Sequence, residues 1–342
     1  MRTRLSAAAV AAFAIASLGA GGIAKADAVS EFYSGKTVTV YVGLAAGGLY
    51  STYAQMMAPH FARHIPGNPN VIVKHQPGAG GLTASNYVYN AAPKDGLHII
   101  TPNAGTSKRA ALAEPGVKFD PRKFQWLGSW GEPVRDCSVW KTAPGTTLKE
   151  AMKKEVILGA IGKSSDTFIN PTVINNVLGT KFKIIPGYGG GSQIRLAMEK
   201  GEVHGWCGQF LGWKTVKPEW LKEGKIVHLV QLNSKRSPDM PNTPLLSEFA
   251  RSDEERQIFG FVQSSLDDRG LAAPPGVPAD RVAALERAYM ATLADPKFLA
   301  DAAKLKLDID VVTSKEIRAF VEQIMAMKPE TVARLKHAMG KD

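Results

Sequence analysis

Cysteine is scarce in this sequence, because Cys137 and Cys207 are the only two among 342 residues. Two cysteines allow at most one intramolecular disulfide, and they do not form the C-x-x-C pair of redox enzymes. A disulfide needs an oxidising compartment and Cα atoms within about 7 Å of each other, so two buried free thiols are the alternative. We expect the disulfide.

Blocks of basic residues are also missing, although the formal net charge is +11. Proteins that bind nucleic acid usually gather Lys and Arg in an arm or on one face. The positive charge here is spread thinly along the chain. This distribution argues against nucleic-acid binding and fits a solvated surface with an anionic ligand.

Long apolar runs are absent after the start of the chain. Residues 1–26 begin with Arg2 and Arg4, continue as an Ala-rich apolar stretch and end in Ala24-Lys25-Ala26. This is the pattern of a secretory signal peptide, and a second A-x-A site ends at Ala28. A membrane anchor is the alternative, but the run is rich in Ala and Gly rather than Leu, and no second span of bilayer length follows. We expect cleavage after residue 26 or 28 and a periplasmic protein.

Signatures of catalysis are absent as well. The stretch "GAIGKSS" (159–165) ends like a phosphate-binding P-loop, but Ile157 stands where that motif needs glycine. His60 and His64 are four residues apart, but Phe61 replaces the glutamate of a zinc-protease motif and no third ligand is evident. No G-x-S-x-G sequence is present. We therefore expect neither an enzyme nor a metal site or cofactor.

Apolar and polar residues alternate in "KTVTVYVGL" (36–44), which predicts a strand. A helix to about His64, a strand at 71–76, a helix to about Asn90 and a strand at 97–103 follow. A second series places strands at 137–141, 156–162, 182–188, 202–208 and 225–233 with helices among them. Alternating strands and helices predict parallel sheets flanked by helices, so the expected fold class is α/β with two units.

Glycines gather where strands pass into helices, at Gly47-Gly48, at Gly78, Gly80 and Gly81, and at 189–191. Residues without Cβ permit tight turns and let backbone N–H groups approach a ligand. The positive end of a helix dipole favours an anion there, and ligands of open α/β sheets bind at the carboxyl ends of strands. One such turn would be only a turn, but three indicate an anion-binding cleft.

Five segments, taken in order, resemble the solute-binding receptors of tripartite tricarboxylate transporters, the Bug family. They are "YSGKTVTVYVGLAAGG", "QPGAGG", "NAAPKDG", "PGYGGGSQIRLAMEKGEVHG" and "LAAPPGVPADRVAALERAYMATLADPKF". The resemblance covers about residues 32–336. It implies a type II periplasmic-binding-protein fold, with lobe one at 29–135 and 234–342, lobe two at 136–233, and two crossing hinge strands.

The resemblance also implies that a small carboxylate binds between the lobes, which close on it and deliver it to membrane permease subunits. The implied ligand-binding residues in lobe one are Ala46, Gly47, Gly48, Leu49, Tyr50, Ser51, Pro77, Gly78, Ala79, Gly80, Gly81, Thr83, Asn103 and Thr106. Those in lobe two are Ser164, Ser165, Asp166, Thr167, Tyr188, Gly190 and Ser192. A monomer is expected, because a closing cleft needs free lobes.

One departure from the family pattern is Ser51, which stands where an acidic residue usually opens the helix. It keeps an N-cap oxygen but removes a negative charge, which suits a more anionic ligand or the loss of an amino-group contact. Arg135 and Arg269 are candidates for pairing with a carboxylate, because a guanidinium offers a planar fork. For Arg269 the alternative is a salt bridge with its neighbours Asp267 and Asp268.

Two other functions remain open from the sequence. The same fold could serve a periplasmic sensor, presenting its closed form to a histidine kinase instead of a permease. A secreted α/β enzyme belongs to a different class and would need a nucleophile with a base or a metal site in the cleft. The sequence leaves the identity of the carboxylate open.

Overall fold

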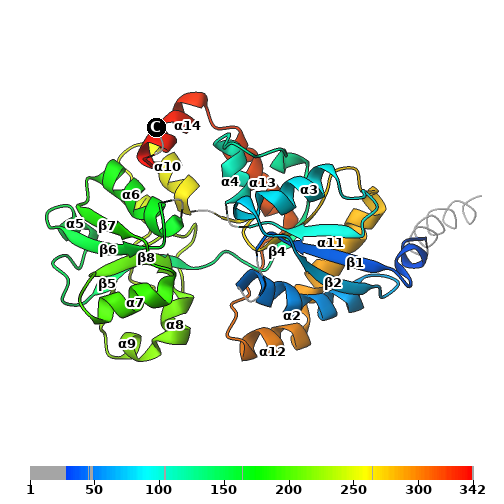
Figure 1. Cartoon of the computed structure of the whole chain (residues 1–342), viewed down its shortest axis with the longest axis horizontal. Coiled ribbons are helices and arrows are strands. Elements are labelled where there is room, and N and C mark those ends of the chain that lie inside the picture. Colours follow the sequence, from blue (N-terminus) through cyan, green and yellow to red (C-terminus); the bar gives the residue numbers. More distant parts are fainter. Residues whose placement is uncertain are drawn as a thin grey trace, which may run out of the picture. The chain divides into compact units, whose positions relative to one another are not determined.

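The computed structural model describes residues 28–44, 46, 49–103, 105–163, 165–263 and 265–340 (Figure 1). The predicted signal peptide (1–26) and the predicted ligand-binding residues Gly47, Gly48 and Ser164 lie outside this set. The described residues form two compact units. Unit 1 consists of the described residues within Met1–Thr106, Pro115–Gly131 and Arg269–Ala319. Unit 2 consists of the described residues within Ser107–Glu114, Glu132–Asp268 and Phe320–Asp342.

Unit 1 is built on a five-stranded mixed sheet. Its strands, in sheet order, are β2 (Asn70–His75), β1 (Thr37–Val42), β3 (His98–Thr101), β10 (Gly270–Ala273) and β4 (Gln125–Ser129). The first three are parallel, whereas β10 runs antiparallel to both of its neighbours. The alternation of valines at 36–44 predicted that one face of this strand is buried. Val38 and Val40 are indeed fully buried in the core of unit 1.

Two long helices cover the sheet of unit 1. α2 (Leu49–His64) and α11 (Ala279–Ala294) pack on the sheet and on each other, and α12 (Pro296–Lys304) packs on α2. Phe61 of α2 meets Tyr289 of α11 edge-to-face, with ring centroids 5.9 Å apart. Both rings are fully buried, so this contact fixes the two helices on the sheet.

Unit 2 repeats the arrangement of its sheet. The strands, in sheet order, are β7 (Phe182–Pro186), β6 (Val156–Ala160), β8 (Gly205–Gln209), β5 (Arg135–Trp140) and β9 (Ile226–Gln231). β6 is parallel to β7 and β8, and β5 is antiparallel to β8 and β9. In both units, therefore, three parallel strands from one strand–helix–strand–helix–strand run are followed in the sheet by one strand antiparallel to them and by a fifth strand antiparallel to that one.

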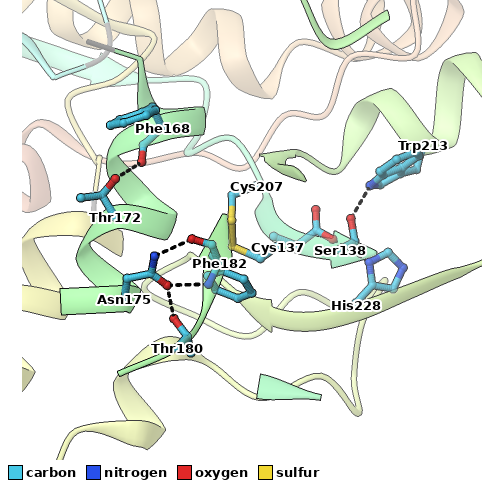
Figure 2. The surroundings of a disulfide bond; sticks show 11 residues. Cys137, Ser138, Phe168, Thr172, Asn175, Thr180, Phe182, Cys207, Trp213 and His228 are labelled. Carbon is cyan, nitrogen blue, oxygen red and sulfur yellow. Dashed lines mark hydrogen bonds and ion pairs between the residues drawn. A yellow bond between two sulfur atoms is a disulfide. The ribbon is translucent and has the colours of Figure 1, made fainter. Parts of the chain in front are cut away.

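Side chains tie the helices of unit 2 to its strands (Figure 2). Asn175 of α6 (Asp166–Leu178) donates to the carbonyl of Phe182 at 2.8 Å and accepts from the Phe182 N–H at 3.0 Å. Trp213 of α8 (Leu211–Val216) donates from its indole to the Ser138 hydroxyl of β5 at 3.1 Å. These bonds hold α6 at β7 and α8 at β5.

The remaining elements are short or peripheral. They are η1 (Ala79–Gly81), α3 (Leu82–Asn90), α4 (Thr106–Ala111), η2 (Pro121–Lys123), α5 (Leu148–Ala151), α7 (Gly191–Glu199), α9 (Pro218–Lys222), η3 (Leu246–Phe249), α10 (Asp253–Gln263), α13 (Ser314–Met325) and α14 (Pro329–Ala338). Within the part of the chain that the structure describes, no helix is both long and apolar enough to cross a bilayer.

The predicted α/β fold class is confirmed. Every strand predicted from the sequence is present within a few residues of its predicted range. The sequence analysis did not predict β4 and β10. The sequence of β10, "GLAA", is four residues long, contains no β-branched residue and is buried on both faces, so it carries no alternation.

Candidate functional site

The two cysteines lie opposite each other in the sheet of unit 2 (Figure 2). Cys137 of β5 is the register partner of Cys207 of β8, their Cα atoms are 3.9 Å apart, and they form a disulfide. Both side chains are buried. The predicted disulfide is therefore confirmed, and it joins neighbouring strands of a single unit.

Unit 2 contains a pocket of about 390 Å³ that begins beside this disulfide. It lies where β6 and β8 end and where α6, α7 and α8 begin, the position at which open α/β sheets bind ligands. Pockets that hold small molecules in proteins start at about 300 Å³. The residues that line it are Arg135, Ile161, Ser165, Asp166, Thr167, Asn170, Gly191, Arg195, Trp206, Cys207, Gly208, Gln209, Leu211, Gly212 and Thr215.

Three residues predicted to bind the ligand, Ser165, Asp166 and Thr167, line this pocket at the start of α6. Two of their hydroxyls also hold the preceding turn: Ser165 Oγ lies 2.7 Å from Thr167 Oγ1, which accepts from the N–H of Ile161 at 2.9 Å. Ser165 Oγ donates to the carbonyl of Gly162 at 2.6 Å. These bonds fix the wall of the pocket, while the side chain of Asp166 is 58% exposed.

Arg135 reaches the pocket from the first residue of β5. Its Nη2 donates to Asp268 Oδ2 at 2.9 Å, and Asp166 Oδ2 lies 3.8 Å from the same nitrogen. The side chains of Arg135 and Asp268 are only 6% and 1% exposed, so their charges are paired away from water. Arg135, a sequence candidate for binding a carboxylate, is thus present in the pocket with protein carboxylates beside it.

Further charged groups of unit 2 are buried, as Asp267 is, or half-buried, as Glu132 and Lys108 are. Burial raises the pKa of Asp267, whose Oδ2 accepts from the backbone N–H of Ser107 at 3.1 Å. Burial also raises the pKa of Glu132, although its Oε1 accepts from the N–H of Ser265 at 2.6 Å. Burial lowers the pKa of Lys108. This partial burial strengthens the charge interactions of these groups.

The other predicted residues of lobe two lie directly before α7 or in its first turn. Tyr188 and Gly190 precede the helix, and Ser192 lies in its first turn. None of the three lines the pocket, whereas their neighbour Gly191 does. The Ser192 hydroxyl accepts instead from Arg195 Nη2 at 3.2 Å.

The glycine turn of unit 1 has an unusual backbone. Gly78, Ala79, Gly80 and Gly81 all have positive φ, between 48° and 140°, directly before α3. A Cβ on Gly81 would lie 2.4 Å from Nδ2 of Asn103, which donates to the carbonyl of Gly80 at 3.1 Å. The stretch Pro77–Gly80 is exposed. Close packing on Asn103 thus accounts for Gly81.

The remaining predicted residues of lobe one surround this turn or precede it. Thr106 donates its hydroxyl to the Asn103 carbonyl at 2.7 Å. Buried Ser51 lies 2.9 Å from Nε2 of His75 through its hydroxyl, so it bonds within unit 1. Among the others, Ala46 and Thr83 are exposed, Tyr50 is half-buried, and Leu49 begins α2.

Arg269 is buried inside unit 1 and has a φ of 56°. Its guanidinium carbon lies 5.0 Å from the centre of the Tyr53 ring, which stacks on Trp130 at 5.1 Å. Its Nη1 lies 3.4 Å from the Tyr53 hydroxyl. These contacts give Arg269 a structural role in the core of unit 1, and Asp268 pairs with Arg135 instead.

The predicted set omitted several pocket residues, above all Arg195 and Trp206. Arg195 carried a readable signal, because it lies one helical turn before Met198 in α7 and next to Ile194, both buried. An arginine on the apolar stripe of a helix is not a surface residue.

Histidines do not gather into a metal site in the described part of the chain. His60 Nε2 lies 3.1 Å from Asp301 Oδ2, and His64 Nε2 lies 3.2 Å from Asp295 Oδ2. Each histidine of α2 is therefore bonded to a carboxylate near or within α12 and helps to join these two helices.

The sequence matches a family described as "Tripartite tricarboxylate transporter family receptor" over residues 57–336. No curated protein matches it. One similar solved structure is a solute-binding protein of this family from Polaromonas, without ligand. It is 18% identical, and the match covers 91% of this chain and 100% of that one with a TM-score of 0.72.

Two further structures come from Rhodopseudomonas palustris. MatC, with bound malate, is 22% identical over 89% of this chain and 99% of that one, with a TM-score of 0.60. A second protein, with adipate, is 19% identical over 89% of this chain and 97% of that one, with a TM-score of 0.61. At these identities the similarity shows the fold, which is that of periplasmic binding proteins.

Proposed function

We propose, from the premise that this chain belongs to the tripartite tricarboxylate transporter receptor family, that it captures a small organic carboxylate. It acts as the soluble receptor of a membrane transporter and does not turn its ligand over. The ligands of two similar structures, malate and adipate, are carboxylates, which supports this class of ligand.

The observation that carries the ligand class is the pocket of unit 2, into which two arginines extend. Guanidinium groups bind carboxylates through two parallel hydrogen bonds, and such bonds strengthen where water is excluded. Asn170 and Gln209 add polar groups, and Trp206 and Leu211 add apolar surface. A few polar groups in a largely apolar pocket are typical of a site for a small organic ligand.

The glycine turn of unit 1 is the second part of the proposal. We propose that its exposed backbone, next to the start of α3, binds a carboxylate through N–H groups. The N-terminus of a helix favours an anion because the helix dipole is positive there. Asn103 stabilises the turn through its hydrogen bond to the Gly80 carbonyl.

Cell location and partners follow from the family, whose members are periplasmic receptors that work with membrane transporters. We propose export through the signal-peptide pattern at 1–26, delivery of the ligand to permease subunits, and a monomeric receptor. Closure of the two lobes on the ligand, which the resemblance implies, would produce the form that the permease recognises.

The test of this proposal is a thermal-shift screen of the purified mature protein. Linear dicarboxylates of four to eight carbons and terephthalate are compared with their matched monocarboxylates, with amino acids and sugars as controls. A ligand at about 100 times its dissociation constant should add about 2.7 kcal/mol of stability, seen as a rise in Tm. Shifts with carboxylates, without their consumption, support the receptor. A panel of carboxylates without any shift contradicts it.

Replacing Gly80 by valine tests the glycine turn. We expect a loss of at least about 1.4 kcal/mol, or tenfold, in the affinity for the best carboxylate, because a branched side chain pushes the ligand from the backbone. Calorimetric titration measures it. Valine at Gly35 is the matched control, since Gly35 is also in unit 1, has a φ of 68° against 62° for Gly80, and has open space around it. Equal affinity in Gly80→Val and the wild type would show that the stretch is only a turn.

A further inference from the structure

Asp267 and Ser107 join two segments of unit 2 that lie next to its junctions with unit 1 in the chain. Ser107 follows Thr106, the end of the first segment of unit 1, and Asp268 precedes Arg269, where the chain returns to unit 1. Asp267 Oδ2 accepts a hydrogen bond from the backbone N–H of Ser107 at 3.1 Å. We call Asp267 and Ser107 the junction clamp. In proteins whose domains move, a few residues at such junctions absorb the change in backbone conformation, so a bond between two junction segments restrains them.

The carboxyl group of Asp267 has few partners for its degree of burial. Both Asp267 and Ser107 are fully buried. Oδ1 of Asp267 is also buried and has no hydrogen-bond partner among the described residues. An ionised carboxylate accepts about four hydrogen bonds, and burying one with an unpartnered oxygen is costly. The neutral acid keeps the bond from Ser107 through its carbonyl oxygen and carries no charge.

No cation forms an ion pair with Asp267 in the part of the chain that the structure describes. Lys108 donates from Nζ to the carbonyl of Val262 and to the hydroxyl of Ser265, both at 3.2 Å, rather than to a carboxylate. Arg135 pairs with Asp268. The buried carboxylate of Asp267 therefore lacks a counter-charge of its own.

The charged groups near the clamp do not compensate for this burial. They are Lys108 of α4, Glu132, Arg135, Asp166 and Asp268. Burial is the largest influence on Asp267 and raises its pKa, whereas the hydrogen bonding of Ser107 lowers it. The negative charge of Asp268 raises this pKa further, and the positive charge of Lys108 lowers it. The sum is a pKa above the ordinary value, in agreement with the geometry.

We propose that the junction clamp depends on a proton: it is stable while the carboxyl group of Asp267 is neutral and is weakened when this group ionises. The inference concerns the ligand-free protein and does not rest on the proposed function. Its sign follows from linkage, because the folded state binds this proton more tightly than the unfolded state does. The stabilisation is complete below about pH 4, the ordinary range of aspartate, and is lost as the pH rises through the titration of the buried group.

The experiment measures the Tm of the ligand-free wild type and of Asp267→Asn between about pH 5 and about pH 9. Asparagine has the shape of the neutral acid and keeps a carbonyl oxygen for the Ser107 N–H, but it does not titrate. We expect the Tm of the variant, relative to that of the wild type, to rise by several degrees across this range, because only the wild type acquires a buried charge.

Asp239→Asn is the matched control for this pH series. Asp239 also belongs to unit 2, but it is exposed and its Oδ2 lies 3.0 Å from Nζ of Lys214 at the surface. Exposed ion pairs contribute little to stability, so the Tm of this variant should follow that of the wild type. Parallel pH profiles for the wild type and Asp267→Asn would overturn the inference.

Carbon-13 NMR of protein labelled at the side-chain carboxyl carbon of aspartate observes the proton directly. The resonance that disappears in Asp267→Asn belongs to Asp267, and we expect it to titrate well above about pH 4. A resonance that titrates in the ordinary range of aspartate contradicts the proposal, even if the Tm profiles differ. Where asparagine prevents folding, Asp267→Ser identifies the same resonance.

Alanine at position 267 separates the bond from the charge. Asp267→Ala removes the acceptor of the Ser107 N–H, so we expect a Tm several degrees below that of the wild type at about pH 5. Amide hydrogen exchange of the peptide that contains Ser107 should be faster in Asp267→Ala than in Asp267→Asn. Equal exchange and equal Tm in the two variants would show that the bond restrains nothing, and the clamp would be refuted.

Discussion

Replacing both Cys137 and Cys207 by alanine is expected to destabilise the protein by about 4 kcal/mol. The disulfide closes a loop with a sequence separation of 70 residues. Closing a loop of that length removes conformational entropy from the unfolded chain, and the chain-entropy relation gives this magnitude. For a unit of this size about 4 kcal/mol corresponds to a fall in Tm of about 10 °C.

Thermal unfolding with and without a reductant measures this effect. Reduction should lower the Tm of the wild type almost to that of the double alanine variant. The Tm of the double alanine variant should not change when reductant is added. A wild type whose Tm is unchanged after complete reduction, verified by a thiol count, would contradict the prediction. Unit 2 should account for the loss, since both cysteines belong to its sheet.

Replacing Asp268 by alanine is expected to cost about 3–5 kcal/mol, because the buried Arg135 loses the carboxylate at 2.9 Å. Asp166→Ala is the matched control on the same arginine. Its carboxylate is 58% exposed and lies 3.8 Å from Arg135 Nη2, so its loss should cost about 1 kcal/mol or less. Urea-induced unfolding of the two variants measures the difference.

A double variant decides whether the unpaired charge causes that cost. In Arg135→Met/Asp268→Ala no charge of this pair remains buried, so much of the stability lost in Asp268→Ala should return. If the double variant is no more stable than Asp268→Ala, the pair contributes through packing or other hydrogen bonds. The affinity of the double variant for carboxylates then shows, separately from its stability, whether Arg135 takes part in ligand binding.

Periodicity accounted for most of the fold. Valines at 38, 40 and 42 alternate because one face of β1 meets a helix layer, and such a pattern is legible in the sequence. β10 was missed because its burial does not alternate, and because its partners β3 and β4 come from a distant part of the chain. Pairing between segments so far apart leaves no local pattern.

The candidate site was predicted less completely than the fold. Ser165, Asp166 and Thr167 were predicted from the family resemblance, and the structure places them in the lining of the pocket at the carboxyl edge of the sheet. Arg195 was missed because its importance depends on Trp206 and Gly212, which lie in other elements. The glycines before α3 were predicted to let a ligand approach the backbone. Part of their role is instead to make room for Asn103, a neighbour in space that no local sequence pattern identifies.

The pairing of the only two cysteines leaves the folded protein without a native thiol. A single cysteine introduced at the edge of the pocket, for example at Thr215, would therefore be the one site for maleimide chemistry. An environment-sensitive fluorophore attached there would report occupancy of the pocket as a change in emission. The same bond that braces the sheet thus makes the receptor suitable for conversion into an optical sensor of organic acids.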